Sequence, residues 1–151
     1  GCRVIFHSVT GKSRCTEYPG VDKDTLLAEC DFLSLHCPLS DLSRNFIDRA
    51  ALRKMKHTAV LINVARGPVV NNTDLYEALE AGEIAAAGLD VLEKEPLSLD
   101  NPLSRFRDST RLIITPHLAW ASAEARRRCV EEAYRNIAAF LQGENRNVVN
   151  P

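Results

Sequence analysis

Short apolar runs alternate with helical patterns along most of the chain. Runs rich in β-branched and aliphatic residues predict five strands, over residues 3–7, 31–36, 59–64, 85–91 and 111–115. Their apolar character is nearly continuous, as expected of parallel strands that are covered on both faces. Strands that alternate with helices are typical of βαβ units. We therefore predict an α/β fold, in which a parallel sheet carries helices on both faces.

Side chains that can cap a helix precede each helical pattern and offer an oxygen to free backbone N–H groups. The predicted starts are Asp22, Asp48, Asn72 or Thr73, and Ser122. Gly82 and Gly143 are expected to end the third and the last helix, because glycine readily takes the left-handed conformation that follows a helix. The last helix repeats apolar or small residues at four-residue intervals, and we expect this face to pack against the sheet. These residues are Cys129, Ala133, Ile137 and Leu141.

Composition narrows the classes of partner. The 151 residues suit one domain and carry a net charge of −1, so no broad electric field attracts nucleic acid or an acidic membrane. A small molecule is the expected ligand. The five cysteines are odd in number and form no CxxC pair, which argues against a disulfide framework and a metal site. No apolar run approaches the roughly 20 residues of a membrane helix, and we expect a cytoplasmic protein.

Polar side chains follow the last three predicted strands, where ligands bind in open α/β sheets. Arg66 follows the third, Asp90 lies at the end of the fourth and Glu95 five residues further on, and His117 follows the fifth. Singly, Arg66 is as well explained as a surface residue capping a strand, Glu95 is uninformative, and a lone histidine is more often structural. Together they form a plausible trio. Histidine transfers protons near neutral pH, a neighbouring carboxylate favours its charged form, and arginine suits an anionic substrate.

Four motifs occur in a fixed order between about residue 31 and residue 120. They are His36-Cys37-Pro38-Leu39-Ser40, Leu61-Ile62-Asn63-Val64-Ala65-Arg66-Gly67, Gly88-Leu89-Asp90-Val91 through Glu95-Pro96, and Thr115-Pro116-His117. In order and spacing they resemble the NAD-binding domain of the D-isomer-specific 2-hydroxyacid dehydrogenase family. The resemblance implies a Rossmann-like sheet. The stretch from Thr115 to Val149 resembles the glycerate dehydrogenase or hydroxypyruvate reductase branch.

The resemblance also implies a role for each matched residue. Arg66 would bind the carboxylate and carbonyl of a 2-oxo acid, and His117 would be general acid in reduction and base in oxidation. Glu95 would pair with His117, and Asp90 would hold the nicotinamide carboxamide. Asn63 is interpreted as structural. The expected cofactor is NAD or NADP, and the expected contacts to it are Ser8, Cys37, Pro38, Val64, Ala65, Arg66, Asp90, His117 and Ala119.

The sequence departs from the family in two respects. The glycine-rich G-x-G-x-x-G turn is absent, so residues 1–151 are expected to be a nucleotide-binding domain fragment truncated before the second strand. This fragment lacks the Gly-rich first βα unit and the substrate domain of a chain about twice as long. In addition, Ser8 stands where NAD-binding members usually have aspartate, with Lys12 and Arg14 nearby, so a 2′-phosphate is an open alternative.

The expected reaction is the reversible reduction of a small 2-oxo acid, hydroxypyruvate or glyoxylate, to D-glycerate or glycolate. The full-length protein is expected to be a homodimer, and the 151-residue chain alone is expected to be inactive. The alternative is a non-catalytic NAD(H)-sensing module similar to a corepressor on the same fold. Such a module has no need of a paired His117 and Glu95.

Overall fold

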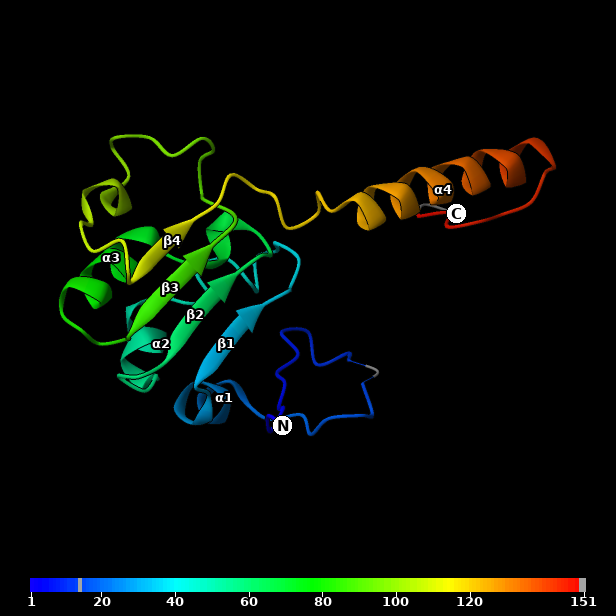
Figure 1. The fold of residues 1–151 in the computed structure, drawn as a ribbon. Coiled ribbons are helices and arrows are strands. Elements are labelled where there is room, and N and C mark those ends of the chain that lie inside the picture. The colour runs from blue at the N-terminus through cyan, green and yellow to red at the C-terminus, as the bar shows by residue number, and fades with distance from the viewer. Residues whose placement is uncertain (14, 150–151) are drawn as a thin grey trace. The chain divides into compact units, whose positions relative to one another are not determined.

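The computed structural model describes residues 1–13 and 15–149, which form two units, Gly1–His117 and Leu118–Pro151. The first unit contains a four-stranded parallel sheet in the order β1-β2-β3-β4 (Figure 1). The strands are β1 Phe32–Leu35, β2 Val60–Asn63, β3 Ala86–Leu89 and β4 Leu112–Ile114. Each lies inside a predicted range and is shorter at its ends. The α/β fold and the parallel sheet are thus confirmed.

Most of the helices begin at the predicted capping residues. The α-helices are α1 Lys23–Glu29, α2 Arg49–Lys54, α3 Asn72–Glu80 and α4 Ala123–Leu141, and two short 3-10 helices are η1 Gly67–Val69 and η2 Pro102–Arg105. The side chains of Asp22, Asp48 and Ser122 each accept a backbone N–H from the first turn of their helix. A side-chain oxygen at this position satisfies a donor that has no partner within the helix.

The N-cap of helix α3 lies one residue earlier than predicted. Its N-cap is Asn71, whose side-chain oxygen accepts the N–H groups of Thr73 (3.0 Å) and Asp74 (3.1 Å). The predicted cap at Asn72 or Thr73 is therefore wrong, because the side-chain amide oxygen of Asn71 already accepts from the free N–H groups. The predicted end is confirmed, since Gly82 takes a left-handed φ of 68° directly after the cap.

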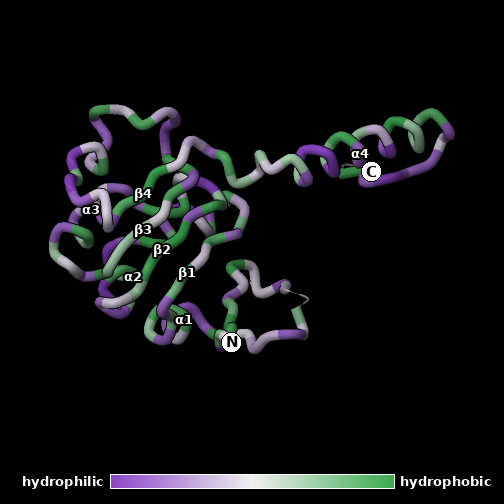
Figure 2. The backbone as a smooth tube through the Cα atoms, in the orientation of Figure 1, coloured by the Kyte–Doolittle hydropathy of each residue, from purple (hydrophilic) through white to green (hydrophobic). Residues whose placement is uncertain are grey.

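Only one face of the sheet is packed in the described unit. Side chains that alternate along the strands are buried on this face: Leu33, Leu35, Leu61, Asn63, Ala87 and Leu89. Helices α1, α2 and α3 supply the facing core, including Leu27, Leu52 and Leu79, which are fully buried. On the opposite face Phe32 is 71% exposed and Ile113 is 60% exposed. Helices on both faces were predicted, and the described residues provide one layer. Figure 2 shows how apolar residues run along β2 and β4.

The predicted strand at residues 3–7 is not formed. Phe6 makes one isolated parallel bridge to Gly20, with its N–H donating to Pro19 O (3.1 Å) and its carbonyl accepting from Val21 (2.8 Å). A β-strand requires a series of backbone hydrogen bonds to a neighbouring strand, and this segment makes only one bridge. The apolar pattern of this segment was read correctly, but the described chain supplies no strand beside it.

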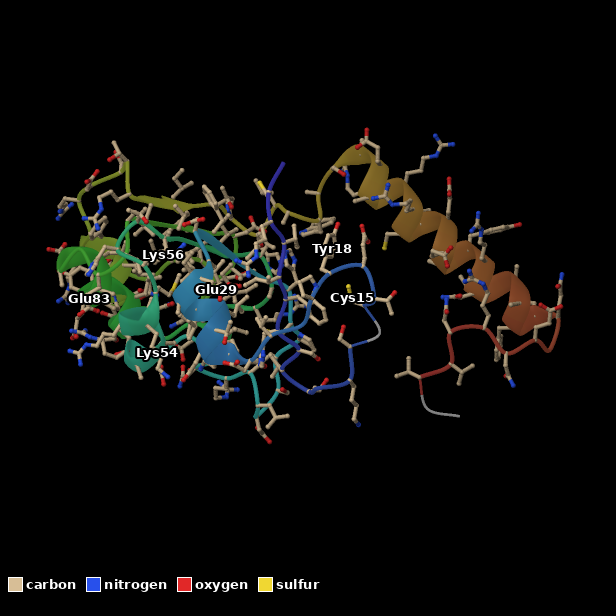
Figure 3. All side chains as sticks on the ribbon, turned by 90° about the horizontal axis from the view of Figure 1, so that it is seen from below. Cys15, Tyr18, Glu29, Lys54, Lys56 and Glu83 are labelled. Atoms are coloured by element: carbon tan, nitrogen blue, oxygen red, sulfur yellow. The ribbon has the colours of Figure 1, made fainter. Side chains whose placement is uncertain are left out.

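Ion pairs join the loops and helices at the amino ends of the strands. Lys54 Nζ lies 2.6 Å from Asp24 Oδ1, and Lys56 Nζ lies 2.8 Å from Asp31 Oδ1. Figure 3 labels the two lysines. These side chains are largely exposed, so each pair contributes about 0–1 kcal/mol. The opposite edge of the sheet, at the carboxyl ends, carries the residues singled out by the sequence.

The second unit contains the long helix α4. The four residues expected to form its packing face are exposed, and no described part of this unit covers them: Cys129, Ala133, Ile137 and Leu141. Their packing against the sheet stays a prediction. Gly143, with φ of 74°, ends the helix as predicted.

All five cysteines are free, and the described residues contain no cluster of histidine, cysteine or acidic side chains that could hold a metal ion. Among the described helices, none combines the length and the apolar character that crossing a membrane requires.

Candidate functional site

The carboxyl ends of β2, β3 and β4 lie at one level of the sheet. Asn63 is in register with Leu89, which is in register with Ile114. The backbone hydrogen bonds between neighbouring strands continue one residue beyond the strand ends. Asp90 N–H donates to Asn63 O and Thr115 N–H donates to Leu89 O, both at 2.9 Å. The segments that follow the three strands are therefore held at a common edge.

Glu95 and His117 form a direct pair at this edge. His117 Nδ1 lies 3.0 Å from Glu95 Oε2, while Glu95 Oε1 accepts the Leu92 N–H, also at 3.0 Å. Two hydrogen bonds lower the pKa of Glu95 below its ordinary value. The bond from the Leu92 N–H has the larger effect, and the bond to His117 has the smaller one. Glu95 is thus a carboxylate at neutral pH, with one oxygen fixed by backbone and the other on the histidine. The predicted pairing of these two residues has the geometry it requires.

The backbone of His117 is held in an uncommon conformation. Its φ is 55°, in the left-handed region that non-glycine residues rarely adopt, and its N–H donates to Asp90 O (2.9 Å). Such conformations persist where surrounding contacts determine them, and they gather at functional sites. The side chain is 42% exposed, so the imidazole is both anchored and accessible.

Arg66 extends from a loop that Asn63 braces. The Asn63 side chain is 1% exposed, donates from Nδ2 to Arg66 O and accepts the Ala65 N–H at Oδ1, both at 3.0 Å. These two hydrogen bonds agree with the structural role expected for Asn63. The guanidinium of Arg66 donates to Ala65 O (2.7 Å), and the residue is exposed. A fixed backbone with an exposed guanidinium suits capture of an anion.

Gly67 brings the Arg66 loop against the loop that leads to Glu95. A Cβ on Gly67 would lie 1.9 Å from both the carbonyl carbon and oxygen of Leu92 and 2.4 Å from Glu93 N. Only glycine permits backbones to approach this closely. At Gly67 the backbone therefore lies directly against the backbone of Leu92. Arg66 and Glu95 thus stand on loops that touch.

One cavity gathers the polar residues that follow β3 and β4. It has a volume of about 440 Å³ and is lined by Asp90, Glu95, Thr115 and His117 together with apolar side chains that include Leu92. Asp90 is 6% exposed, and its Oδ1 accepts the Thr115 hydroxyl at 2.5 Å. Sequence reasoning missed this role of Thr115, although the residue stands in the same motif as His117.

A second cavity lies along β1 and has a volume of about 630 Å³. Ser8, Cys37, Pro38 and Lys12 all line it, so three of the predicted cofactor contacts come together there. Burial raises the pKa of the Cys37 thiol, which therefore acts as a neutral wall residue near pH 7.

Four predicted cofactor contacts are not among the residues that line these two cavities: Val64, Ala65, Arg66 and Ala119. Val64 and Ala65 connect the end of β2 to Arg66, and Ala65 is buried. Ala119 belongs to the second unit. The roles of all four in cofactor binding stay predictions.

Comparison with known proteins gives consistent results. The model for the D-isomer specific 2-hydroxyacid dehydrogenase NAD binding domain matches residues 1–119. Hydroxypyruvate reductase of Blautia hydrogenotrophica is 42% identical over 130 residues, 86% of this chain and 39% of that protein. Glyoxylate reductase of Thermofilum pendens is 49% identical over 123 residues, 82% of this chain and 35% of that protein.

A solved structure supports the same assignment. The NAD-complexed D-isomer specific 2-hydroxyacid dehydrogenase of Lactobacillus delbrueckii ssp. bulgaricus aligns with a TM-score of 0.87 at 31% identity, covering 99% of this chain and 49% of that one. The chain described here spans less than half the length of each of these proteins. It belongs to the D-isomer specific 2-hydroxyacid dehydrogenase family, and the part of that family it represents is the NAD-binding domain.

Proposed function

We propose that the full-length protein reduces a small 2-oxo acid reversibly and stereospecifically with NADH or NADPH. Hydroxypyruvate and glyoxylate are the proposed substrates, and D-glycerate and glycolate the products. The observation that carries the proposal is the 3.0 Å contact between His117 and Glu95 in the cavity that Asp90 also lines. The names of the two relatives, a hydroxypyruvate reductase and a glyoxylate reductase, support the substrate class.

His117 acts in this proposal as the general acid of reduction. Its Nδ1 faces Glu95, so Nε2 is the nitrogen that donates a proton to the carbonyl oxygen of the substrate. In the reverse direction Nε2 takes the proton of the substrate hydroxyl. Glu95 sets the orientation of the ring and stabilises the charged imidazolium, because it is itself a carboxylate at neutral pH.

Arg66 binds the substrate carboxylate in the proposal. Its planar guanidinium can make two parallel hydrogen bonds, which fix both the position and the orientation of a carboxylate. The Asn63 bonds and the Gly67 contact hold the backbone of this loop against the Glu95 loop. Such bracing sets where the acid substrate lies relative to His117.

The residues present suit a dinucleotide. The buried carboxylate of Asp90 is an acceptor for a carboxamide N–H, and the cavity lined by Ser8, Cys37 and Pro38 offers a mixed surface for an adenosine. When bound, the nicotinamide supplies the hydride. Ser8 presents no negative charge to a 2′-phosphate, and Lys12 lines the same cavity. These two residues support use of NADPH as well as NADH.

We also propose that a Gly-rich βα unit and a substrate domain complete the protein. The Asp31 carbonyl accepts from Val60 on β2 (2.9 Å), so alternation points the backbone groups of Phe32 and Ser34 away from β2. No described strand pairs with that edge of β1. A further parallel strand there would also give residues 3–7 a neighbour. A homodimer and a cytoplasmic location belong to the same proposal.

Steady-state kinetics of the full-length protein test the proposal. NADH and NADPH oxidation should be followed with hydroxypyruvate, glyoxylate, pyruvate and a 3-oxo acid as control. We expect the largest kcat/KM with hydroxypyruvate or glyoxylate and no turnover of the 3-oxo acid. Dinucleotide binding without turnover of any 2-oxo acid would reject the enzyme and support a sensing module. Size-exclusion chromatography with light scattering tests the homodimer.

A further inference from the structure

Thr115 is tied to β3 by both its backbone and its side chain. Its N–H donates to Leu89 O at 2.9 Å, and its hydroxyl donates to Asp90 Oδ1 at 2.5 Å. The backbone bond continues the β3–β4 ladder by one residue. The side-chain bond adds nothing to that ladder, and its target is the carboxylate that lines the cavity beside His117.

The Asp90 carboxylate depends on such a donor. It is only 6% exposed, and a buried carboxylate needs hydrogen bonds to remain charged. A hydroxyl that donates to a charged oxygen makes a short and comparatively strong bond, as the 2.5 Å distance illustrates. Because the bond engages one oxygen of the carboxylate, it also limits rotation about the terminal side-chain torsion, which is otherwise broad.

Asp90 and Thr115 are also linked to the proton-transfer residue. The Asp90 carbonyl accepts the His117 N–H at 2.9 Å, two residues after Thr115. The same short segment therefore holds the Asp90 backbone through His117 and the Asp90 side chain through Thr115. A change at Thr115 alters the direction of the carboxylate while leaving the backbone bond to His117 in place.

We propose that Thr115 is a positioning residue for the nicotinamide end of the cofactor. It holds the Asp90 carboxylate in the orientation that accepts the N–H of the carboxamide, and does not touch the reacting atoms itself. The inference rests on the proposed function for the identity of the ligand. This role differs from a role in folding alone. A residue that only stabilises the fold would affect the binding of dinucleotides with and without a carboxamide equally.

Binding to two dinucleotides separates these roles. The full-length protein, Thr115→Val and Thr115→Ser should be titrated calorimetrically with NAD⁺ or NADP⁺ and with the corresponding 3-acetylpyridine analogue, whose methyl ketone has no N–H to donate. We expect Thr115→Val to weaken binding of the natural cofactor about tenfold, the usual effect of losing one hydrogen bond to a charged group. With the analogue the loss should be under about threefold, and Thr115→Ser should restore parental binding of both.

Thr110→Val is the matched control. The Thr110 hydroxyl donates to Asp108 Oδ1 at 2.6 Å in an exposed loop that does not line the cavity. Its removal deletes the same kind of bond and should leave both affinities unchanged. Melting temperatures of all the variants show whether any loss follows from unfolding.

Equal losses for the natural cofactor and the analogue, or no loss with either, would overturn the role of Thr115. So would a parent protein that binds no dinucleotide. A parent that binds dinucleotide but reduces no 2-oxo acid would reject the proposed reaction alone, because the Thr115 titrations measure binding and do not require turnover.

Discussion

Two regions of the molecule differ in how many hydrogen bonds the described residues make there. One is the pair of loops after β3 and β4, and the other is the outer edge of β1. After β3 and β4, hydrogen bonds of 2.5 to 3.0 Å connect Asp90, Thr115, Glu95 and His117 into one network. Along β1, Phe32 is 71% exposed, and the nearby segment that begins the chain makes a single bridge. A site built from consecutive βα units forms once those units pair, whereas the outer edge of β1 has no partner among the described strands.

The largest expected effect lies in the β3–β4 network. His117→Gln in the full-length protein removes the group proposed to exchange a proton with the substrate, while an amide of similar size preserves much of the packing. We expect turnover with hydroxypyruvate or glyoxylate to fall by a factor of about 10² to 10⁴, with dinucleotide affinity little changed. Single-turnover and steady-state rates measure this effect.

His57→Gln is the control for this variant. The His57 ring contacts the Gly82 carbonyl (3.2 Å) in an exposed loop that lines neither cavity, so turnover should stay parental. If His117→Gln also retained parental turnover, the hydrogen-bond network would have only a structural role. The difference between this network and the β1 edge would then say nothing about catalysis.

A smaller effect is expected at the β1 side, where no described strand pairs with the outer edge of β1. Ser8→Asp places a carboxylate in the cavity that Lys12 also lines, where it accepts from ribose hydroxyls and repels a 2′-phosphate. We expect the parent to use NADPH at least as well as NADH, and Ser8→Asp to shift the ratio of kcat/KM values toward NADH by about tenfold. Initial rates with both cofactors give this ratio.

Ser109→Asp adds the same charge in an exposed loop that lines neither cavity and should leave the cofactor ratio unchanged. A parent whose efficiency with NADH exceeds that with NADPH by about a hundredfold would show that Ser8 does not select for phosphate.

Local signals predicted the parts of the fold that local contacts determine. Asp22 and Asp48 were identifiable as caps because a cap bonds to amides two or three residues ahead. The start of α3 was misplaced because Asn71, Asn72 and Thr73 are all competent caps, and only the backbone path selects among them. The strand at residues 3–7 was mispredicted because a strand depends on a neighbour that the pattern does not contain.

The same distinction applies to the site. Glu95 and His117 were predicted to meet because adjacent parallel strands end at one edge, and this reasoning needs only strand order. The contact between Gly67 and Leu92 was not predicted, since it depends on the course of two irregular loops. The Thr115 bond to Asp90 was missed because the family motif draws attention to the histidine and gives no reason for the threonine.

The smallest expected effect concerns the charge of Glu95. Its pKa is lowered in the folded protein, chiefly by the Leu92 N–H and then by His117, so ionised Glu95 stabilises the fold at neutral pH. This contribution is present above the unfolded pKa of about 4.3 and is lost as pH falls through the lower folded pKa. Glu95→Gln should therefore reduce the free energy of unfolding at pH 7, and the difference from the parent should shrink below about pH 4. Because the side chain is 40% exposed, the difference at pH 7 should be at most about 1 kcal/mol.

Urea unfolding of the full-length protein at several pH values measures this difference, with Glu93→Gln as the matched control. Glu93 is an exposed neighbour on the same loop, and its replacement should change the free energy of unfolding little at any pH. A Glu95→Gln difference that does not shrink as the pH falls below the unfolded pKa of about 4.3 would mean that the amide disturbs the loop itself, since the contribution of the charge is lost in that range. A difference confined to neutral pH would show that the ionised carboxylate, held by Leu92 and His117, is what stabilises the completed side of the site.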